Sequence, residues 1–159
     1  MMNRSLFTFR SRVRGLTLME LMIAIAILGI LMSIALPIYK DSIRKGRRSE
    51  AFSALTAVQQ KQERWRANNA AYSTDMSAAT GLDIPTSTAN GFYTISIDAA
   101  DATSYTVRAS AVGGTSQAED GNCSQLRVRL AAGNQLNYGS ASSGSSTFDE
   151  SVGNRCWSR

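Results

Sequence analysis

The sequence predicts an α+β fold in which one long N-terminal α-helix is followed by an antiparallel β-sheet. Three patterns predict it. Residues 21–39 carry no formal charge, an apolar spacing typical of an amphipathic helix continues to about residue 68, and apolar and polar residues alternate in the C-terminal half. A chain of 159 residues has room for one domain with a modest core, plus a segment outside that core.

The uncharged run LMIAIAILGILMSIALPIY predicts a membrane helix over residues 16–39. Its residues 21–39 would span about 28 Å as a helix, at about 1.5 Å per residue. This length matches a hydrocarbon core of about 30 Å. Pro37 is expected to kink or loosen the helix because it removes one backbone hydrogen bond, and Gly29 adds a second soft point.

An amphipathic helix is expected over residues 40–68, and its apolar face is expected to pack on the sheet. That face repeats every three or four residues and consists of Ala51, Leu55, Val58, Gln62 and Trp65. The opposite face carries Arg44, Arg48, Glu63 and Arg66. The basic cluster at residues 40–48 is interpreted as a collar facing solvent or lipid headgroups, and a nucleic-acid patch is the less favoured alternative.

The C-terminal half predicts a loop over residues 69–90 and a sheet over 91–138. Alternation predicts strands near residues 93–97, 105–111 and 126–130, with a short strand near 136–138. Each strand has one apolar and one polar face, which suits an antiparallel sheet packed on a helix. The low-complexity stretch at 139–147 is expected to be flexible.

Composition argues against an enzyme. The chain has no His, and its many Ser residues therefore have no His partner. We expect no catalytic residues, no cofactor and no metal site, and a calcium site at Glu119, Asp120 and Asn122 is only weakly indicated.

The net charge of +5 depends on where the chain begins. Residues 1–15 hold four arginines and no acid, so the rest of the chain carries 13 basic and 12 acidic residues, a net charge of +1. Such a nearly neutral domain argues against binding to a polyanion, and nucleic acid is an unlikely partner on this ground. The four arginines are Arg4, Arg10, Arg12 and Arg14.

The two cysteines, Cys123 and Cys156, lie in the C-terminal third. In an oxidising compartment they would tend to pair and close a loop of about 33 residues. In the cytosol they would remain free thiols, so their state depends on export.

The stretch from Arg14 to Met22, RGLTLMELM, resembles the cleavage motif of type IV prepilins. The resemblance implies that a prepilin peptidase removes a leader at residues 1–15 by cutting between Gly15 and Leu16. It also implies N-methylation of Leu16, a position where the family most often has Phe. Glu20 becomes the fifth mature residue, and Pro37 falls where the family also has a proline.

The resemblance implies a role for Glu20 in assembly. A carboxylate in an apolar helix bundle is costly unless it is paired. Glu20 of one subunit can face the new amino group of Leu16 on a neighbour, which would fix the axial offset between subunits. A rival interpretation is an ordinary signal-peptidase site at residues 33–35, which would release a soluble domain; Glu20 and Pro37 argue against it.

The implied protein is a structural subunit of a type IV pilus, a minor pilin that supports adhesion, twitching motility or DNA uptake. It would sit in the bacterial inner membrane as a single-pass protein with a periplasmic C-terminus, then in the extracellular pilus. Its partners would be other pilin subunits, the prepilin peptidase and the pilus assembly machinery. The implied disulfide-bounded region at residues 123–156 and the ending Cys156-Trp157 resemble the minor pilins of the PilE group.

Two alternatives remain open. One is a pseudopilin of a type II secretion system, which would share the N-terminal motif; the cysteine pair favours the pilus. The other is a DNA-receptor pilin used in competence, against which the near-neutral charge counts.

Overall fold

The computed structural model describes residues 15–157, and the four leader arginines lie outside this range. The helix α1 runs without interruption from Leu18 to Arg66 and contains Pro37. The chain divides into two compact units between Tyr39 and Lys40. We call the α1 residues up to Tyr39 the stem and residues 40–157 the head, and we describe each separately.

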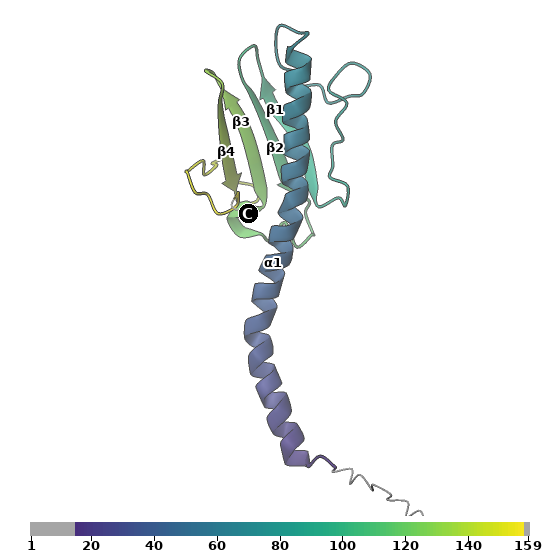
Figure 1. The fold of residues 1–159 in the computed structure, drawn as a ribbon, viewed down its shortest axis with the longest axis vertical. Helices are drawn as coiled ribbons and strands as arrows, with labels where there is room; N and C mark the ends of the chain where they lie inside the picture. The colour runs from purple at the N-terminus through teal and green to yellow at the C-terminus, as the bar shows by residue number, and fades with distance from the viewer. Residues whose placement is uncertain (1–14, 158–159) are drawn as a thin grey trace, which may run out of the picture. The chain divides into compact units, whose positions relative to one another are not determined.

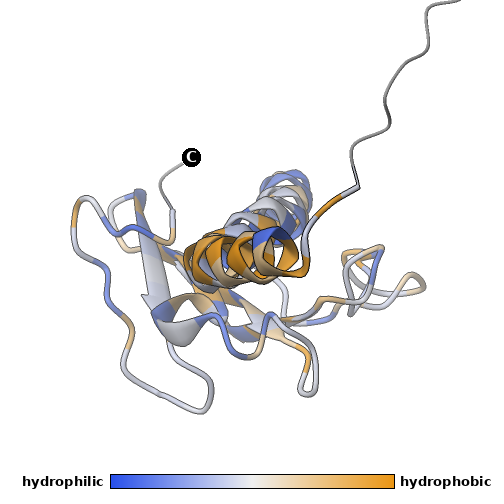
Figure 2. Ribbon diagram, turned by 90° about the horizontal axis from the view of Figure 1, so that it is seen from below, coloured by the Kyte–Doolittle hydropathy of each residue, from blue (hydrophilic) through white to orange (hydrophobic). Residues whose placement is uncertain are grey.

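The stem is a helix with no apolar partner in the described chain. Its large apolar side chains have exposed fractions from 49% at Met32 to 79% at Leu18, and Figure 2 shows the hydrophobic colouring of these turns. Among residues 15–157, α1 is the one helix long and apolar enough to cross a membrane. Such a surface is stable only inside a bilayer or against other apolar helices. The helix contains Pro37 without a break, so the predicted kink there stays a prediction.

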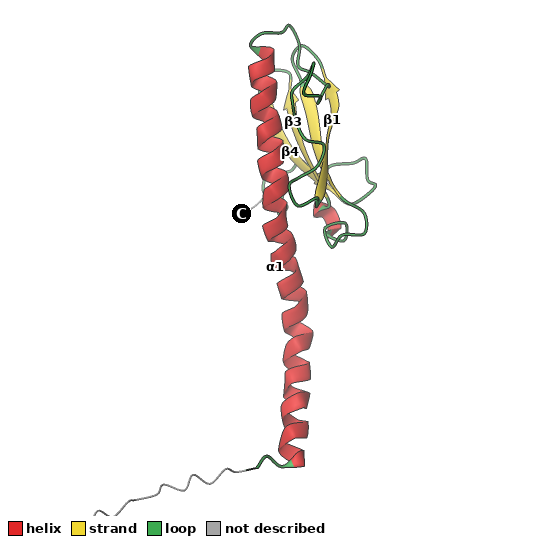
Figure 3. Cartoon of the chain, turned by 90° about the vertical axis from the view of Figure 1, so that its right-hand side faces the viewer, coloured by secondary structure: helices red, strands yellow, loops and turns green. Residues whose placement is uncertain are grey.

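The head contains a four-stranded antiparallel meander (Figures 1 and 3). The strands are β1 (Tyr93–Ala100), β2 (Tyr105–Ala111), β3 (Gln125–Ala131) and β4 (Gln135–Ala141), and they follow one another in this order across the sheet. A short 3₁₀ helix, η1 (Gly121–Cys123), precedes β3. The predicted α+β fold with an antiparallel sheet is confirmed.

The core lies between α1 and one face of the sheet. Ala51, Leu55 and Val58 are almost fully buried, as the apolar spacing of the sequence predicts, and Gln62 is buried beside them. Trp65 is only half-buried. The sheet contributes Tyr93, Ile95, Tyr105, Val107, Ala109, Leu126, Val128 and Leu130.

The end of the sheet differs from the sequence prediction. Gly139, Ser140 and Ala141 belong to β4 and are buried, so the expectation of a flexible stretch was wrong for these three residues. They pair with Arg127, Leu126 and Gln125 of β3. Their small side chains carry no alternating pattern, which is why composition alone read them as loop.

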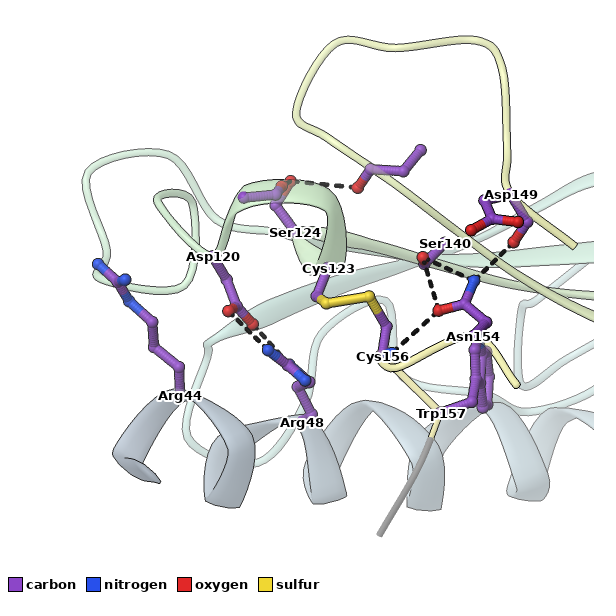
Figure 4. The surroundings of a disulfide bond; sticks show 12 residues. Arg44, Arg48, Asp120, Cys123, Ser124, Ser140, Asp149, Asn154, Cys156 and Trp157 are labelled. Atoms are coloured by element: carbon purple, nitrogen blue, oxygen red, sulfur yellow. Dashed lines mark hydrogen bonds and ion pairs between the residues drawn. A yellow bond between two sulfur atoms is a disulfide. The ribbon is translucent and has the colours of Figure 1, made fainter. Parts of the chain in front are cut away.

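The helix face expected to be solvated also differs. Arg44 and Arg48 are half-buried, because the connection between β2 and β3 folds back against this part of α1 and supplies their partners (Figure 4). The interpretation of residues 40–48 as a collar facing solvent or headgroups is therefore wrong for these two arginines.

Candidate functional site

The N-terminal end of α1 is capped by Thr17. The Thr17 hydroxyl accepts a hydrogen bond from the backbone N–H of Glu20 at 3.1 Å, and the Thr17 carbonyl accepts one from Leu21 at 3.1 Å. Thr followed three residues later by Glu is the spacing of a capping box, a signal that sequence reasoning missed. Gly15 and Leu16 lie just before the first helical turn.

The base of the head is held by a buried ion pair. The Arg48 guanidinium donates through Nε to Asp120 Oδ2 at 2.6 Å and through Nη2 to Asp120 Oδ1 at 2.8 Å. This hydrogen-bonded pairing raises the pKa of Arg48 against the opposing effect of burial. Because Asp120 is fully used by an arginine, it is not free for calcium. Among residues 15–157 no group of three or more acidic, Cys or His side chains could hold a metal ion.

A disulfide joins Cys123 to Cys156 and ties the C-terminal end to the start of β3 (Figure 4). The predicted pairing is confirmed. Asn154 organises the surrounding backbone, because its Nδ2 donates to Ser140 Oγ at 2.9 Å and to the Asp149 carbonyl at 2.7 Å. Its Oδ1 accepts from the Cys156 backbone at 2.9 Å.

Trp157 completes this C-terminal anchor. Its ring stacks on Phe52 of α1 with centroids 4.9 Å apart and lies 5.0 Å from the ring of Tyr138 on β4. Its Nε1 donates to the Gly139 carbonyl at 3.0 Å. Trp157 is thus fixed both to α1 and to β4.

Three arginines lie on the face of the sheet turned away from α1, and we call them the arginine row: Arg108 of β2, and Arg127 and Arg129 of β3. Their neighbours in sequence, such as Val107 and Val128, are buried on the helix side, and side chains alternate along a strand. Arg108 pairs directly with Arg127 across the two strands. The strand register therefore gathers three cations on one surface.

Each arginine of the row is only partly paired. Arg108 donates through Nη2 to Asp98 at 2.9 Å. Arg127 and Arg129 donate through Nη2 to the two oxygens of a single carboxylate, Glu150, at 2.5 and 2.6 Å. These hydrogen bonds, with that from Arg129 the largest influence, lower the pKa of Glu150.

The Nε atoms of all three arginines are buried and have no hydrogen-bond partner. Nε and Nη2 form one side-on donor edge of a guanidinium, and Arg48 fills both donors on Asp120. The row thus presents three cations with half of each side-on edge unused. Guanidinium groups in such an arrangement can bind carboxylate or phosphate oxygens.

Sequence reasoning did not find this row. It assigned Arg127 and Arg129 to the polar face of a strand. The alternation within each strand does not predict the register between strands, so it could not place Arg108 opposite Arg127. The one available signal was Arg-X-Arg within a predicted strand, since such residues share a face.

An apolar helical stem continued into a head with an antiparallel sheet and a C-terminal disulfide is the architecture of a type IV pilin. Residues 10–36 match the prokaryotic N-terminal methylation motif. Residues 37–127, more than half of the chain, match the family described as type IV minor pilin ComP, DNA uptake sequence receptor. The chain belongs to this family of pilus subunits, which are structural proteins and not enzymes.

Curated relatives agree with this placement. The chain is 43% identical over 74 residues to a fimbrial protein of Moraxella nonliquefaciens, covering 46% of this chain and 48% of the relative. It is 45% identical over 65 residues to the fimbrial protein EcpC of Eikenella corrodens (36% and 42%). It is 43% identical over 63 residues to the type IV major pilin protein PilE1 of Neisseria gonorrhoeae (35% and 38%). The chain thus spans less than half the length of these relatives.

The family match bears on two expectations from the sequence, the one about nucleic acid and the choice among the alternative functions. Its description as a DNA uptake sequence receptor is at odds with nucleic acid being an unlikely partner, and it favours the DNA-receptor alternative. Net charge averages over the whole surface and does not report local clusters such as the three cations that the arginine row places on one face. The chain is a prepilin with an apolar N-terminal helix, consistent with residence in a membrane and then in a pilus.

Proposed function

We propose that this chain is a DNA-receptor minor pilin that binds the DNA backbone through the arginine row on the outer face of its sheet. The single observation that carries the proposal is the row itself, which places three arginines on one face of the sheet, with Arg108 opposite Arg127 and with Nε donors that have no partner. Membership in the ComP family supports the choice of DNA over other polyanions.

The charge balance of the surface sets the expected strength of binding. The three arginines face two carboxylates, Asp98 and Glu150, so their net charge is +1. Binding is therefore expected to be modest and strongly dependent on salt, because backbone contacts act mainly by releasing cations from DNA.

Fluorescence anisotropy of a labelled mixed-sequence DNA duplex, with the full-length chain in neutral detergent across a salt series, tests this proposal. Arg108→Gln should weaken binding and reduce the salt slope by about 0.9, the loss of one phosphate contact. Arg64→Gln is the matched control, because it removes one charge from an exposed position on α1. Equal losses in the two variants, or no binding by the wild-type chain, would sink the proposal.

We also propose the maturation and assembly of the stem that the prepilin motif implies. The peptidase cuts between Gly15 and Leu16 and Leu16 is N-methylated. The subunit spans the inner membrane once, with its C-terminus in the periplasm, before it joins other pilins in a filament with adhesion and twitching among its roles. Support comes from the methylation motif at residues 10–36 and from the position of Gly15 and Leu16 outside the first helical turn.

Intact mass of the membrane-extracted protein tests maturation and the disulfide together. The expected mass lacks residues 1–15, gains one methyl group and loses two hydrogens. A chain recovered with its first fifteen residues, or as a soluble species cut near residue 35, would rule out this route.

A further inference from the structure

The C-terminal segment 147–151, which we call the strap, lies in contact with β4. Asp149 forms a β-bridge with Ser140, with N···O distances of 2.8 and 3.0 Å. Gly139 makes the close approach possible, because a Cβ there would lie 3.0 Å from Glu150 Cγ and 3.2 Å from Phe148 Cβ. The strap therefore runs alongside β4, with Phe148 and Glu150 close to Gly139.

The strap holds two members of the row. Glu150 bridges Arg127 and Arg129 through one oxygen each, and the Phe148 ring lies 4.0 Å from the Arg127 guanidinium carbon. The Glu150 side chain is 20% exposed and the Arg127 side chain 21% exposed, so this contact is shielded from solvent on most sides.

The bridge leaves both arginines incompletely satisfied. One carboxylate shared by two guanidinium groups fills Nη2 of each, while both Nε atoms stay buried and unpartnered. Buried donors without an acceptor are costly. A phosphodiester carries one negative charge on two non-bridging oxygens, as the Glu150 carboxylate does on its two, so it can accept hydrogen bonds from the same two guanidinium groups.

We propose that Arg127 and Arg129 form a phosphate-binding site in which Glu150 holds the place of the phosphate, so that the strap and a DNA backbone compete for the same two cations. This inference rests on the proposed function and deepens it. The match to the ComP family ends at residue 127, so Arg129 and Glu150 lie outside that match. Glu150 then competes with the DNA backbone for Arg127 and Arg129 and lowers the affinity of the chain for DNA.

Competition has a specific signature in the salt dependence. Glu150 remains close to the site even when DNA displaces it, and its negative charge offsets one arginine, so the wild-type site neutralises one phosphate fewer than its arginines could. Removing the carboxylate removes this offset. The salt slope should therefore steepen by about 0.9, the contribution of one phosphate contact.

The test compares Glu150→Gln with Asp149→Asn in the full-length chain in neutral detergent, by anisotropy with a labelled DNA duplex. Both variants lose one negative charge from the strap, but the Asp149 carboxylate accepts its hydrogen bond from the backbone N–H of Ser151, within the strap itself. E150Q should bind roughly tenfold tighter, since two charge-assisted hydrogen bonds no longer have to be broken. D149N should stay within about twofold of the wild type.

A double variant checks that the gain runs through the proposed site. Arg129→Gln combined with Glu150→Gln restores the wild-type net charge and should lose the gain in affinity and in salt slope. If E150Q and D149N bind equally, or if the double variant keeps the gain, the competition is wrong while DNA binding by the chain stands. If neither the wild type nor E150Q binds the duplex, both the phosphate site and the proposed function fail.

Discussion

At the scale of single residues, the arginines of the head differ in how fully their donors are used. Arg48 places both side-on donors on Asp120, with side chains 13% and 7% exposed. The arginines of the row share or split their acceptors and keep unpartnered Nε atoms. The first arrangement holds the loop before β3 to α1, whereas the second leaves cations able to exchange one anion for another.

The Arg48–Asp120 pair gives a prediction about stability. Asp120→Ala should lower the free energy of unfolding of the head by about 3–5 kcal/mol, because it leaves Arg48 buried without its carboxylate. The control is Asp41→Ala, which removes an exposed partner of Arg44 and should cost less than about 1 kcal/mol. Denaturant unfolding of the full-length chain, followed by Trp fluorescence, measures both. Equal losses of unfolding free energy in the two variants would show that the buried pair contributes no more to stability than the exposed one.

At the scale of elements, side chains fix the connections that join regular structure. Thr17 begins α1, and Asp101 closes the turn between β1 and β2. Asp101 accepts hydrogen bonds from the backbone N–H groups of Thr103 and Ser104, each at 2.7 Å, and from the Ser104 hydroxyl at 2.6 Å. Such local bonds let the chain reverse without burying unpaired backbone groups.

The Asp101 turn predicts a dependence of stability on pH. Hydrogen bonds, that from the Ser104 hydroxyl first, lower the pKa of Asp101 from 3.8 to about 2. The ionised form is therefore favoured in the folded state, so its contribution is present above pH 3.8 and disappears as the pH falls through about 2. The unfolding temperature should fall across this window.

Asp101→Asn should flatten part of that fall in thermal unfolding, since Asn does not titrate. Hydrogen bonds also lower the pKa values of Asp75, Asp149 and Glu150, so these groups contribute to the remaining slope. Asp83→Asn, at an exposed position with positive φ that Asn tolerates, is the control. An unchanged slope in the Asp101 variant would contradict this account of the turn.

At the scale of the whole molecule, the stem and the head of one chain differ in where they place their apolar side chains. The stem exposes apolar side chains along its length, whereas the head buries its own core and is closed by the disulfide. A cross-link over 33 residues is expected to add about 3–4 kcal/mol of stability by the loop-entropy estimate. The head can therefore remain folded while the stem exchanges lipid for neighbouring helices.

The assembly proposal makes its prediction at this scale. Glu20→Ala should leave the subunit in the membrane, because the change makes the stem more apolar, yet it should impair incorporation into filaments, because the Leu16 amine loses its partner. Quantifying the subunit in membranes and in sheared filaments measures both. Thr17→Val, which removes the capping hydroxyl but keeps the carboxylate, is the control. Normal incorporation of the Glu20 variant would refute the assigned role.

Much of this protein follows from local sequence. The apolar run after Glu20, the spacing of Ala51, Leu55 and Val58, and the alternation in β2 and β3 each report a period that the backbone geometry imposes. The prepilin motif depends on consecutive residues as well. These features were predictable because neighbours in sequence are sufficient to define them.

Tertiary structure decided which polar residues meet. Asp120 reaches Arg48 across 72 positions, and Glu150 reaches Arg127 and Arg129 across 23 and 21. Strand register placed Arg108 opposite Arg127, and the missing Cβ of Gly139 let the strap approach. No local period encodes such pairings, because they depend on how separate elements pack, and the candidate DNA site consists of them.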